Sequence, residues 1–224
     1  MEMESAQWNF KLRRLASEVG QDDGAHDLQH LDRVWQTAEI LLKANPQADG
    51  LVVQAACYLH DLVNLPKNDL ERTQASRMSA QEPRRQLESI YFPTEKLDAV
   101  VHAIETHSFS AAIAPTTLEA KVVQDADRLD ALGAIGLARL FYTAGRMGSA
   151  LAHPTDPLAK HRALDDQVFA LDHIAVKLDS LPGSMQTQAG REIGYARLCF
   201  AHTFCDQFAA EWGSIHVRRY SAQE

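Results

Sequence analysis

A helical repeat of apolar residues dominates this chain and constrains its fold more than any other feature. Between residues 28 and 42, apolar side chains recur at three- and four-residue steps: Leu28, Leu31, Val34, Trp35, Ala38, Leu41 and Leu42. This spacing places them on one face of an α-helix, which we expect to end near Asn45-Pro46. Segments that alternate apolar and polar residues, as half-buried strands do, are almost absent. The sequence therefore predicts an all-α fold.

Other stretches of the chain repeat the helical pattern. We expect them to form helices at about residues 49–62, 97–104, 122–129, 135–142 and 193–212. Leu65-Pro66 should stop the first of these. Thr94 is a candidate cap for the second, because it follows Pro93 at the expected helix entrance.

A loop-like stretch at residues 145–157 could separate two domains. The helices that follow it are too few to bury a core of their own. We therefore expect one all-α domain over residues 1–224, with a C-terminal helical extension from about residue 131.

The composition indicates a soluble globular protein, because 46% of the residues are hydrophobic and 23% are charged. The formal net charge is -8. A negative surface repels polyanions, so we expect no stable binding to nucleic acid and none to an anionic membrane. A small anionic substrate is still compatible with this charge, because a bound cation can reverse the potential locally.

Cysteine content and the terminal segment point to the cytoplasm. Cys57, Cys199 and Cys205 give no paired framework, and each lies in an apolar helical run, so we expect core thiols. Residues 1–10 lack the apolar core of a signal peptide, and no stretch approaches the roughly 18 apolar residues of a membrane span. We expect a cytoplasmic protein.

Four residues could form a metal site: His30, His60, Asp61 and Asp127. Two imidazole nitrogens and two carboxylates suit a borderline divalent ion such as Mn²⁺, Zn²⁺ or Fe²⁺. Such an ion can polarise a phosphoryl oxygen and activate a water molecule near neutral pH.

Each of these residues also has a structural interpretation. A lone histidine such as His30 is usually structural, and His60 with Asp61 could be a simple buried pair. Asp127 and Asp130 share one helix face and should repel each other, which a nearby cation would relieve. Arg128 could relieve that repulsion instead.

In this order of ligands and in its flanking runs, the chain resembles the HD superfamily of metal-dependent phosphohydrolases. More narrowly, it resembles the YedJ-type bacterial HD hydrolases. The shared runs are residues 60–68, 104–110 and 124–136, which carry the His-Asp pair, His107 and Asp127. The superfamily resemblance covers about residues 26–130, and the narrower one continues to Gly190.

The resemblance implies a bundle of mainly antiparallel helices with a divalent metal at its centre. It implies His30, His60, Asp61 and Asp127 as the ligands, and Mn²⁺, Mg²⁺, Zn²⁺, Ni²⁺, Co²⁺ or Fe²⁺ as the ion. Neighbouring polar groups should fix the tautomers of the two histidines. Spacing makes Asp130 and Arg33 candidates for that task.

Three residues could take part in the chemistry. Asp61 could assist the attack on phosphorus. Lys67, six positions after Asp61, could contact the phosphate or could be an ordinary solvated lysine. His107 resembles a position from which some HD enzymes supply an extra histidine. We interpret it as a phosphate contact or general acid, with a capping role as the alternative.

The expected function is hydrolysis of a phosphate ester or anhydride, in a nucleotide or a related phosphorylated metabolite. Asn64 stands where HD 5′-nucleotidases have an acidic residue, which favours the splitting of a nucleoside triphosphate to monophosphate and pyrophosphate. Two alternatives are a catalytically silent nucleotide-sensing HD module and a di-iron oxygenase, although a complete set of extra histidines for a second iron is missing. A homodimer is compatible with the sequence.

Overall fold

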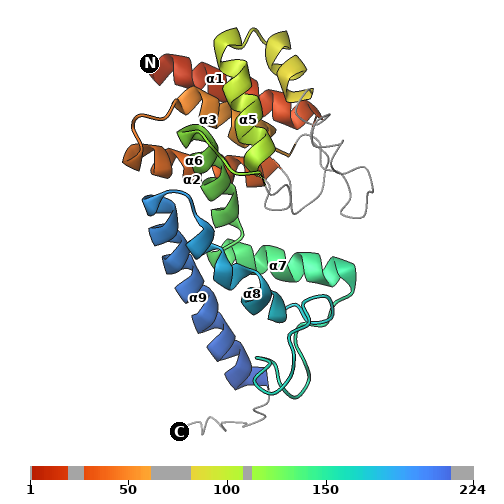
Figure 1. Ribbon diagram of the computed structural model, residues 1–224. Coiled ribbons are helices and arrows are strands. Elements are labelled where there is room, and N and C mark those ends of the chain that lie inside the picture. The colour runs from red at the N-terminus through yellow and green to blue at the C-terminus, as the bar shows by residue number, and fades with distance from the viewer. Residues whose placement is uncertain (1, 20–27, 62–81, 108–112, 213–224) are drawn as a thin grey trace, which may run out of the picture.

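The computed structural model describes residues 2–19, 28–61, 82–107 and 113–212, and these are almost entirely helices and their connections (Figure 1). No strand occurs among them, and their only bridge pairs Ala150 with Phe169. The all-α prediction is therefore confirmed. In chain order the elements are α1 (Glu2–Val19), α2 (Leu28–Ala44), α3 (Gly50–Leu59), a helical segment at 82–89, η1 (Thr94–Lys96), α5 (Leu97–His107), α6 (Leu118–Asp130), α7 (Gly133–Met147), α8 (Asp172–Val176), η3 (Leu178–Ser180), η4 (Pro182–Ser184) and α9 (Gln188–Trp212).

Helix α3 is the centre of the N-terminal bundle. Asp49 caps it by accepting hydrogen bonds from the backbone N–H groups of Leu51 and Val52. Every residue from Val52 to Leu59 is buried, because α1, α2, α5 and α6 all pack against this short helix. Figure 1 shows these helices together in the upper part of the molecule. The burial of so many apolar side chains fixes the position of the turn that follows α3.

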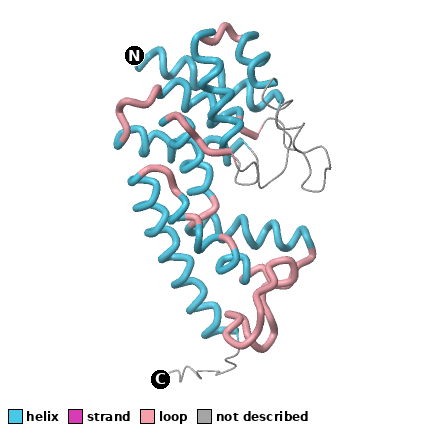
Figure 2. Tube along the Cα trace, viewed as in Figure 1, coloured by secondary structure: helices cyan, strands magenta, loops and turns pink. Residues whose placement is uncertain are grey.

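The C-terminal helices lie below this bundle and are joined to it through α6. Figure 2 shows α7 and α9 diverging from the lower end of α6, with long loops at their far ends. Helix α9 packs against both α6 and α7. The buried carboxylate of Asp125 in α6 accepts hydrogen bonds from the backbone N–H groups of Gln186 and Thr187, just before α9 begins. A side chain of the N-terminal bundle thus binds the entrance of the last helix.

The turn between α6 and α7 depends on two glycines. Gly133 has a φ of +74°, a conformation that other residues rarely adopt. A Cβ atom at Gly136 would collide with the backbone carbonyl group of Ala131. These two glycines allow α7 to start within three residues of the end of α6.

Several expected boundaries were wrong. Helix α3 ends at Leu59 instead of residue 62, so His60 and Asp61 lie in the following turn. Thr94 begins a short 3₁₀ helix and makes no side-chain cap. Helix α7 continues to Met147, beyond the predicted loop start at 145. Helix α9 begins at Gln188 instead of residue 193, because Thr187 caps it by accepting a hydrogen bond from the backbone N–H of Gly190.

Cysteine burial also differs from the prediction. Cys57 is fully buried in α3, as expected for a core thiol. Cys199 is exposed and Cys205 is only partly buried, because α9 turns one side toward solvent. Within the described ranges, no helix is long and apolar enough to cross a membrane.

Candidate metal centre

The four candidate ligands converge from three separate parts of the bundle. His30 comes from the first turn of α2, His60 and Asp61 come from the turn after α3, and Asp127 comes from the last turn of α6. The Nε2 atom of His30 lies 3.6 Å from Asp61 Oδ2 and 3.5 Å from Asp127 Oδ1. The Nε2 atom of His60 lies 3.6 and 3.7 Å from the same two oxygens.

These separations suit a shared ion better than direct hydrogen bonds. Nitrogen–oxygen hydrogen bonds are usually about 2.7–3.2 Å long. Two donor atoms that each lie about 2.1 Å from one ion stand roughly 3.0–3.7 Å apart when the angle between them is about 90–125°. Both imidazoles face both carboxylates within this second range, so the four side chains surround one small volume.

The ring of His60 is oriented so that its Nε2 atom faces this volume. Its Nδ1 atom lies 2.9 Å from the backbone oxygen of Cys57, which can only accept a hydrogen bond. Nδ1 must therefore carry the proton, and in the neutral ring Nε2 carries the lone pair. Nε2 is buried and has no hydrogen-bond partner among the described residues. Such an arrangement is costly unless the lone pair binds something, and a divalent cation fits it.

The ring of His30 is held by the carboxylate of Asp130. His30 Nδ1 donates to Asp130 Oδ2 at 2.7 Å, so Nε2 is left to face Asp61 and Asp127. Arg33 donates to both oxygens of Asp130, at 2.8 and 3.0 Å, and Arg139 donates at 2.6 Å. The structure thus places Asp130 and Arg33 in the orienting role that their spacing indicated.

Arg139 was missed by the sequence analysis. It belongs to α7 and contacts Asp130 because the turn after α6 changes the direction of the chain, so no local pattern identifies it. Arg128, considered as a neutralising group for the acidic cluster, donates to the backbone oxygen and hydroxyl of Ser184, and its charge also interacts with those of Asp125 and Asp127. The charges beside Asp130 come from α2 and α7.

The electrostatics of the site favour a cation among the carboxylates. Burial by itself would lower the pKa of His60, but the negative charges of Asp61 and Asp127 outweigh it and raise the pKa to about 9. Burial would raise the pKa of Asp127, but the imidazoles of His30 and His60 lower it well below its ordinary range. Without a metal ion, a proton on His60 supplies the positive charge that the two carboxylates attract.

His107 adds a third imidazole at the end of α5. Its ring centroid lies 4.8 Å from that of His60, and its Nε2 atom lies 4.0 Å from Asp61 Oδ1. Its Nδ1 atom donates to the backbone oxygen of Ile104, so the neutral ring also presents a lone pair at Nε2. Burial, followed by the charge of His60, lowers the pKa of His107. His60, His107 and Asp127 have potential ligand atoms within 4.8 Å of one another, so His107 lies beside the four candidate ligands.

The remaining candidate cannot be placed. Lys67 lies outside the residues that the structure describes, and so does Asn64. His102 lies on α5 apart from the cluster, where its Nε2 atom accepts a hydrogen bond from the backbone N–H of Thr116. That contact joins α5 to the segment before α6 and is structural.

Comparison with known proteins identifies the family. The HD domain family model matches residues 27–132. The uncharacterised protein YpgQ of Bacillus subtilis is 33% identical over 194 residues, which span 85% of this chain and 84% of that protein.

Solved structures with the same architecture cover nearly all of this chain. The crystal structure of Bacillus subtilis YpgQ in complex with ADP is 32% identical, has a TM-score of 0.72, and covers 92% of this chain and 95% of its own. An HD-superfamily hydrolase from Bacillus thuringiensis is 27% identical with a TM-score of 0.70, covering 95% of this chain and 98% of its own. The similarity therefore extends beyond the residues matched by the domain model.

Proposed function

The chain belongs to the HD superfamily, and from this premise and the geometry of its site we propose that it is a divalent-metal-dependent phosphohydrolase. One observation carries the proposal. The buried Nε2 atom of His60 faces two carboxylates at 3.6 and 3.7 Å and has no hydrogen-bond partner among the described residues. A group arranged in this way is suited to bind a cation.

The ligands would be His30, His60, Asp61 and Asp127. This mixed set of nitrogen and oxygen ligands suits Mn²⁺, Fe²⁺, Co²⁺, Ni²⁺ or Zn²⁺. It should bind Mg²⁺ more weakly, because Mg²⁺ prefers oxygen ligands. A bound ion would supply Lewis acidity, polarising a phosphoryl oxygen and lowering the pKa of water. Asp130 and the backbone at Cys57 already hold the two imidazoles in the required tautomers, so little reorganisation would precede binding.

The protein groups beside the ligands can move protons. The neutral ring of His107, which its lowered pKa favours, can accept a proton at Nε2 from the attacking water. Once protonated, the same nitrogen can donate to a phosphoryl oxygen or to the leaving group. Asp61, with Oδ1 4.0 Å from that nitrogen, would hold the water in line. Lys67 is proposed as a further phosphate contact.

A nucleotide is the proposed substrate class. The YpgQ structure that covers 92% of this chain contains ADP, which supports nucleotide binding here. We further propose that the C-terminal extension belongs to the same domain as the HD core, because Arg139 in α7 contacts Asp130, which in turn holds His30.

The test is a substrate panel with matched variants. Purified protein would be assayed for release of phosphate and pyrophosphate from nucleoside mono-, di- and triphosphates, with Mn²⁺, Mg²⁺, Co²⁺, Ni²⁺ and Zn²⁺ in turn. We expect Asp61→Ala to lose both bound metal and turnover. Asp206→Ala, which changes an exposed carboxylate of α9, should keep both.

The outcomes separate the alternatives. Turnover that needs a divalent ion and vanishes with Asp61→Ala supports the proposal. Nucleotide binding without turnover under any metal would favour a sensing module. An iron chromophore in protein loaded with iron, together with no release of phosphate, would favour an oxygenase.

A further inference from the structure

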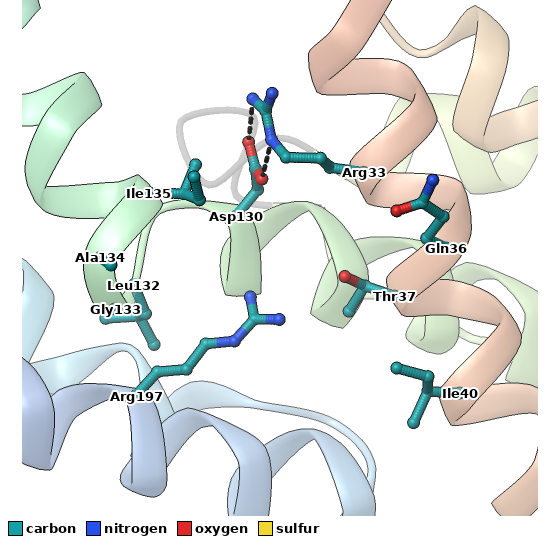
Figure 3. A pocket seen from close by; sticks show the side chains of 10 residues that line it. All are labelled: Arg33, Gln36, Thr37, Ile40, Asp130, Leu132, Gly133, Ala134, Ile135 and Arg197. Carbon is teal, nitrogen blue, oxygen red and sulfur yellow. Dashed lines mark hydrogen bonds and ion pairs between the residues drawn. The ribbon is translucent and has the colours of Figure 1, made fainter.

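A cavity lies beside Asp130, and none of the four candidate metal ligands lines it. It lies between α2, the turn from α6 to α7, and α9, as Figure 3 shows, and its volume is about 360 Å³. Small-molecule sites commonly have volumes of roughly 300–1,000 Å³. The lining side chains that matter here are Arg33, Gln36, Thr37, Ile40, Ile135 and Arg197. Figure 3 shows the two isoleucines at opposite ends of the cavity, with the polar groups between them.

The charged groups of this cavity leave an excess of positive charge. Its one carboxylate, Asp130, already accepts hydrogen bonds from Arg33, Arg139 and His30. The second arginine of the lining, Arg197, makes no ion pair with any described residue. An anion entering the cavity would therefore meet an unneutralised guanidinium group.

Arg197 enters the cavity through a gap that Gly133 leaves open. A Cβ atom at Gly133 would lie 3.3 Å from Arg197 Cγ, so a larger residue would crowd the arginine. Figure 3 shows the side chain extending from α9 toward the end of α6. There its Nη1 atom donates to the backbone oxygen of Leu129 at 2.6 Å.

Most hydrogen-bond donors of Arg197 remain available for a ligand. A guanidinium group has five N–H donors in a planar fork. Only the bond to Leu129 uses one of them within the described part of the chain. Burial also lowers the pKa of Arg197, and the distant charge of Asp130 only partly opposes this effect. A partly buried arginine of this kind is stabilised when an anion binds to it.

We propose that this cavity binds a small organic anion, with its carboxylate or phosphate group at Arg197 and its apolar part against Ile135. The side chain of Ile135 is 47% exposed, so a ligand would bury apolar area there. Gln36 and Thr37 can hydrogen-bond the same head group from α2. The site goes beyond the proposed phosphohydrolase activity and does not require a metal ion.

The test uses probes of one size and different charge. Hexanoate, hexanol and hexylammonium would be titrated into metal-free and Mn²⁺-loaded protein, while the Nε–H signal of Arg197 is followed by NMR. We expect hexanoate to shift this signal with a dissociation constant on the order of 1 mM, a normal value for so small a ligand. Hexanol and hexylammonium should bind at least about tenfold more weakly. Butyl phosphate, titrated in parallel, shows whether phosphate or carboxylate is preferred.

Two variants on α7 provide a matched comparison. Ile135→Glu places a negative charge at the rim of the cavity, and we expect it to weaken hexanoate binding at least about tenfold. Met147→Glu adds the same charge at a residue that is 71% exposed and does not line the cavity, and it should bind like the wild type. Arg197→Met should abolish the preference for hexanoate over hexanol, measured by calorimetry.

Ligand binding alone decides whether this site exists, and hydrolase activity does not need to be measured. Equal binding of hexanoate and hexanol, or no binding of hexanoate or butyl phosphate by folded wild-type protein, would overturn the inference. So would equal hexanoate affinity in Ile135→Glu and Met147→Glu. If Arg197→Met fails to fold, the comparison of these two glutamate variants still decides. A protein without any hydrolase activity could still show the site.

Discussion

Replacing Asp130 by asparagine tests whether the bonds around this carboxylate orient the metal site. Asp130 is 4% exposed and accepts hydrogen bonds from His30, Arg33 and Arg139. Asp130→Asn keeps the shape of the side chain but removes its charge. The amide can still accept on one oxygen, but its NH₂ group faces the donors of an arginine.

The expected loss of stability follows from these contacts. Removing one partner of a buried ion pair costs about 3–5 kcal/mol. The side chains of Arg33 and Arg139 are 29% and 20% exposed, so water recovers part of that loss. We expect the free energy of unfolding of the metal-free protein to fall by about 2–4 kcal/mol, measured by urea denaturation.

Metal affinity should fall as well, because the ring of His30 loses its fixed orientation. Loss of a group that orients a metal-binding histidine typically weakens metal binding about 10- to 100-fold. Titration of the metal-free variant with Mn²⁺ or Zn²⁺ by calorimetry measures this change directly. Turnover at saturating metal then shows how much of the effect comes from binding alone.

Asp32→Asn is the matched control. Asp32 lies on α2, where its carboxylate accepts a hydrogen bond from the hydroxyl of Tyr58, which an asparagine oxygen can also accept. It also forms an ion pair with Arg13, whose side chain is 50% exposed. Such an exposed pair contributes about 0–1 kcal/mol, so the control should lose little stability and no metal affinity. If Asp130→Asn bound metal within about twofold of the wild type and was no less stable than Asp32→Asn, the orienting role of Asp130 would be refuted.

Three other perturbations test separate parts of the argument. The pKa of His60 is raised from 6.5 to about 9 in the metal-free protein, so its charge stabilises the fold below pH 6.5 and this stabilisation is lost as the pH rises to about 9. Metal binding should release that proton and strengthen as pH increases over the same range, which calorimetry in buffers of different ionisation enthalpy detects; affinity independent of pH would contradict it. Arg139→Met should weaken metal binding by about tenfold or less, because Arg33 still binds Asp130, and an unchanged affinity would remove α7 from the support of the site. Gly136→Ala should destabilise the protein by at least about 2 kcal/mol, because its Cβ atom would collide with the backbone of Ala131. Gly145→Ala, in open space on the same helix, should stabilise the protein by about 0.5–1 kcal/mol. Similar melting temperatures for the two variants would show that the turn adapts to the added methyl group.

Much of the fold could be predicted because helix formation depends on near neighbours in the chain. The apolar repeat from Leu28 to Leu42 predicted α2 correctly, and its end near Asn45 agrees with the observed end at Ala44. Helix boundaries were predicted less accurately, because the apolar repeat marks the buried face of a helix and not its caps. The start of α9 at Gln188 is one example: Thr187 caps the helix locally, and Asp125 accepts a hydrogen bond from Thr187 from 62 positions away.

The candidate ligands could be named from the sequence because His30, His60, Asp61 and Asp127 occur in a recognisable order. Spacing along α6 also indicated Asp130, which lies on the same helix face as Asp127. No local pattern could show which histidine nitrogen faces the site, because that depends on what the opposite nitrogen contacts after folding.

The sequence by itself determined the helical class and the set of side chains available for metal chemistry, because both depend on residue type and short-range spacing. Only the tertiary structure decided how those side chains meet. The bond from His30 to Asp130 spans 100 residues, and Arg139 reaches Asp130 only after the chain turns at Gly133. The same packing gathered Arg33 and Arg197, from helices far apart in the chain, around one cavity. Contacts of this kind arise from the packing of whole helices, so their geometry exists only in the folded molecule.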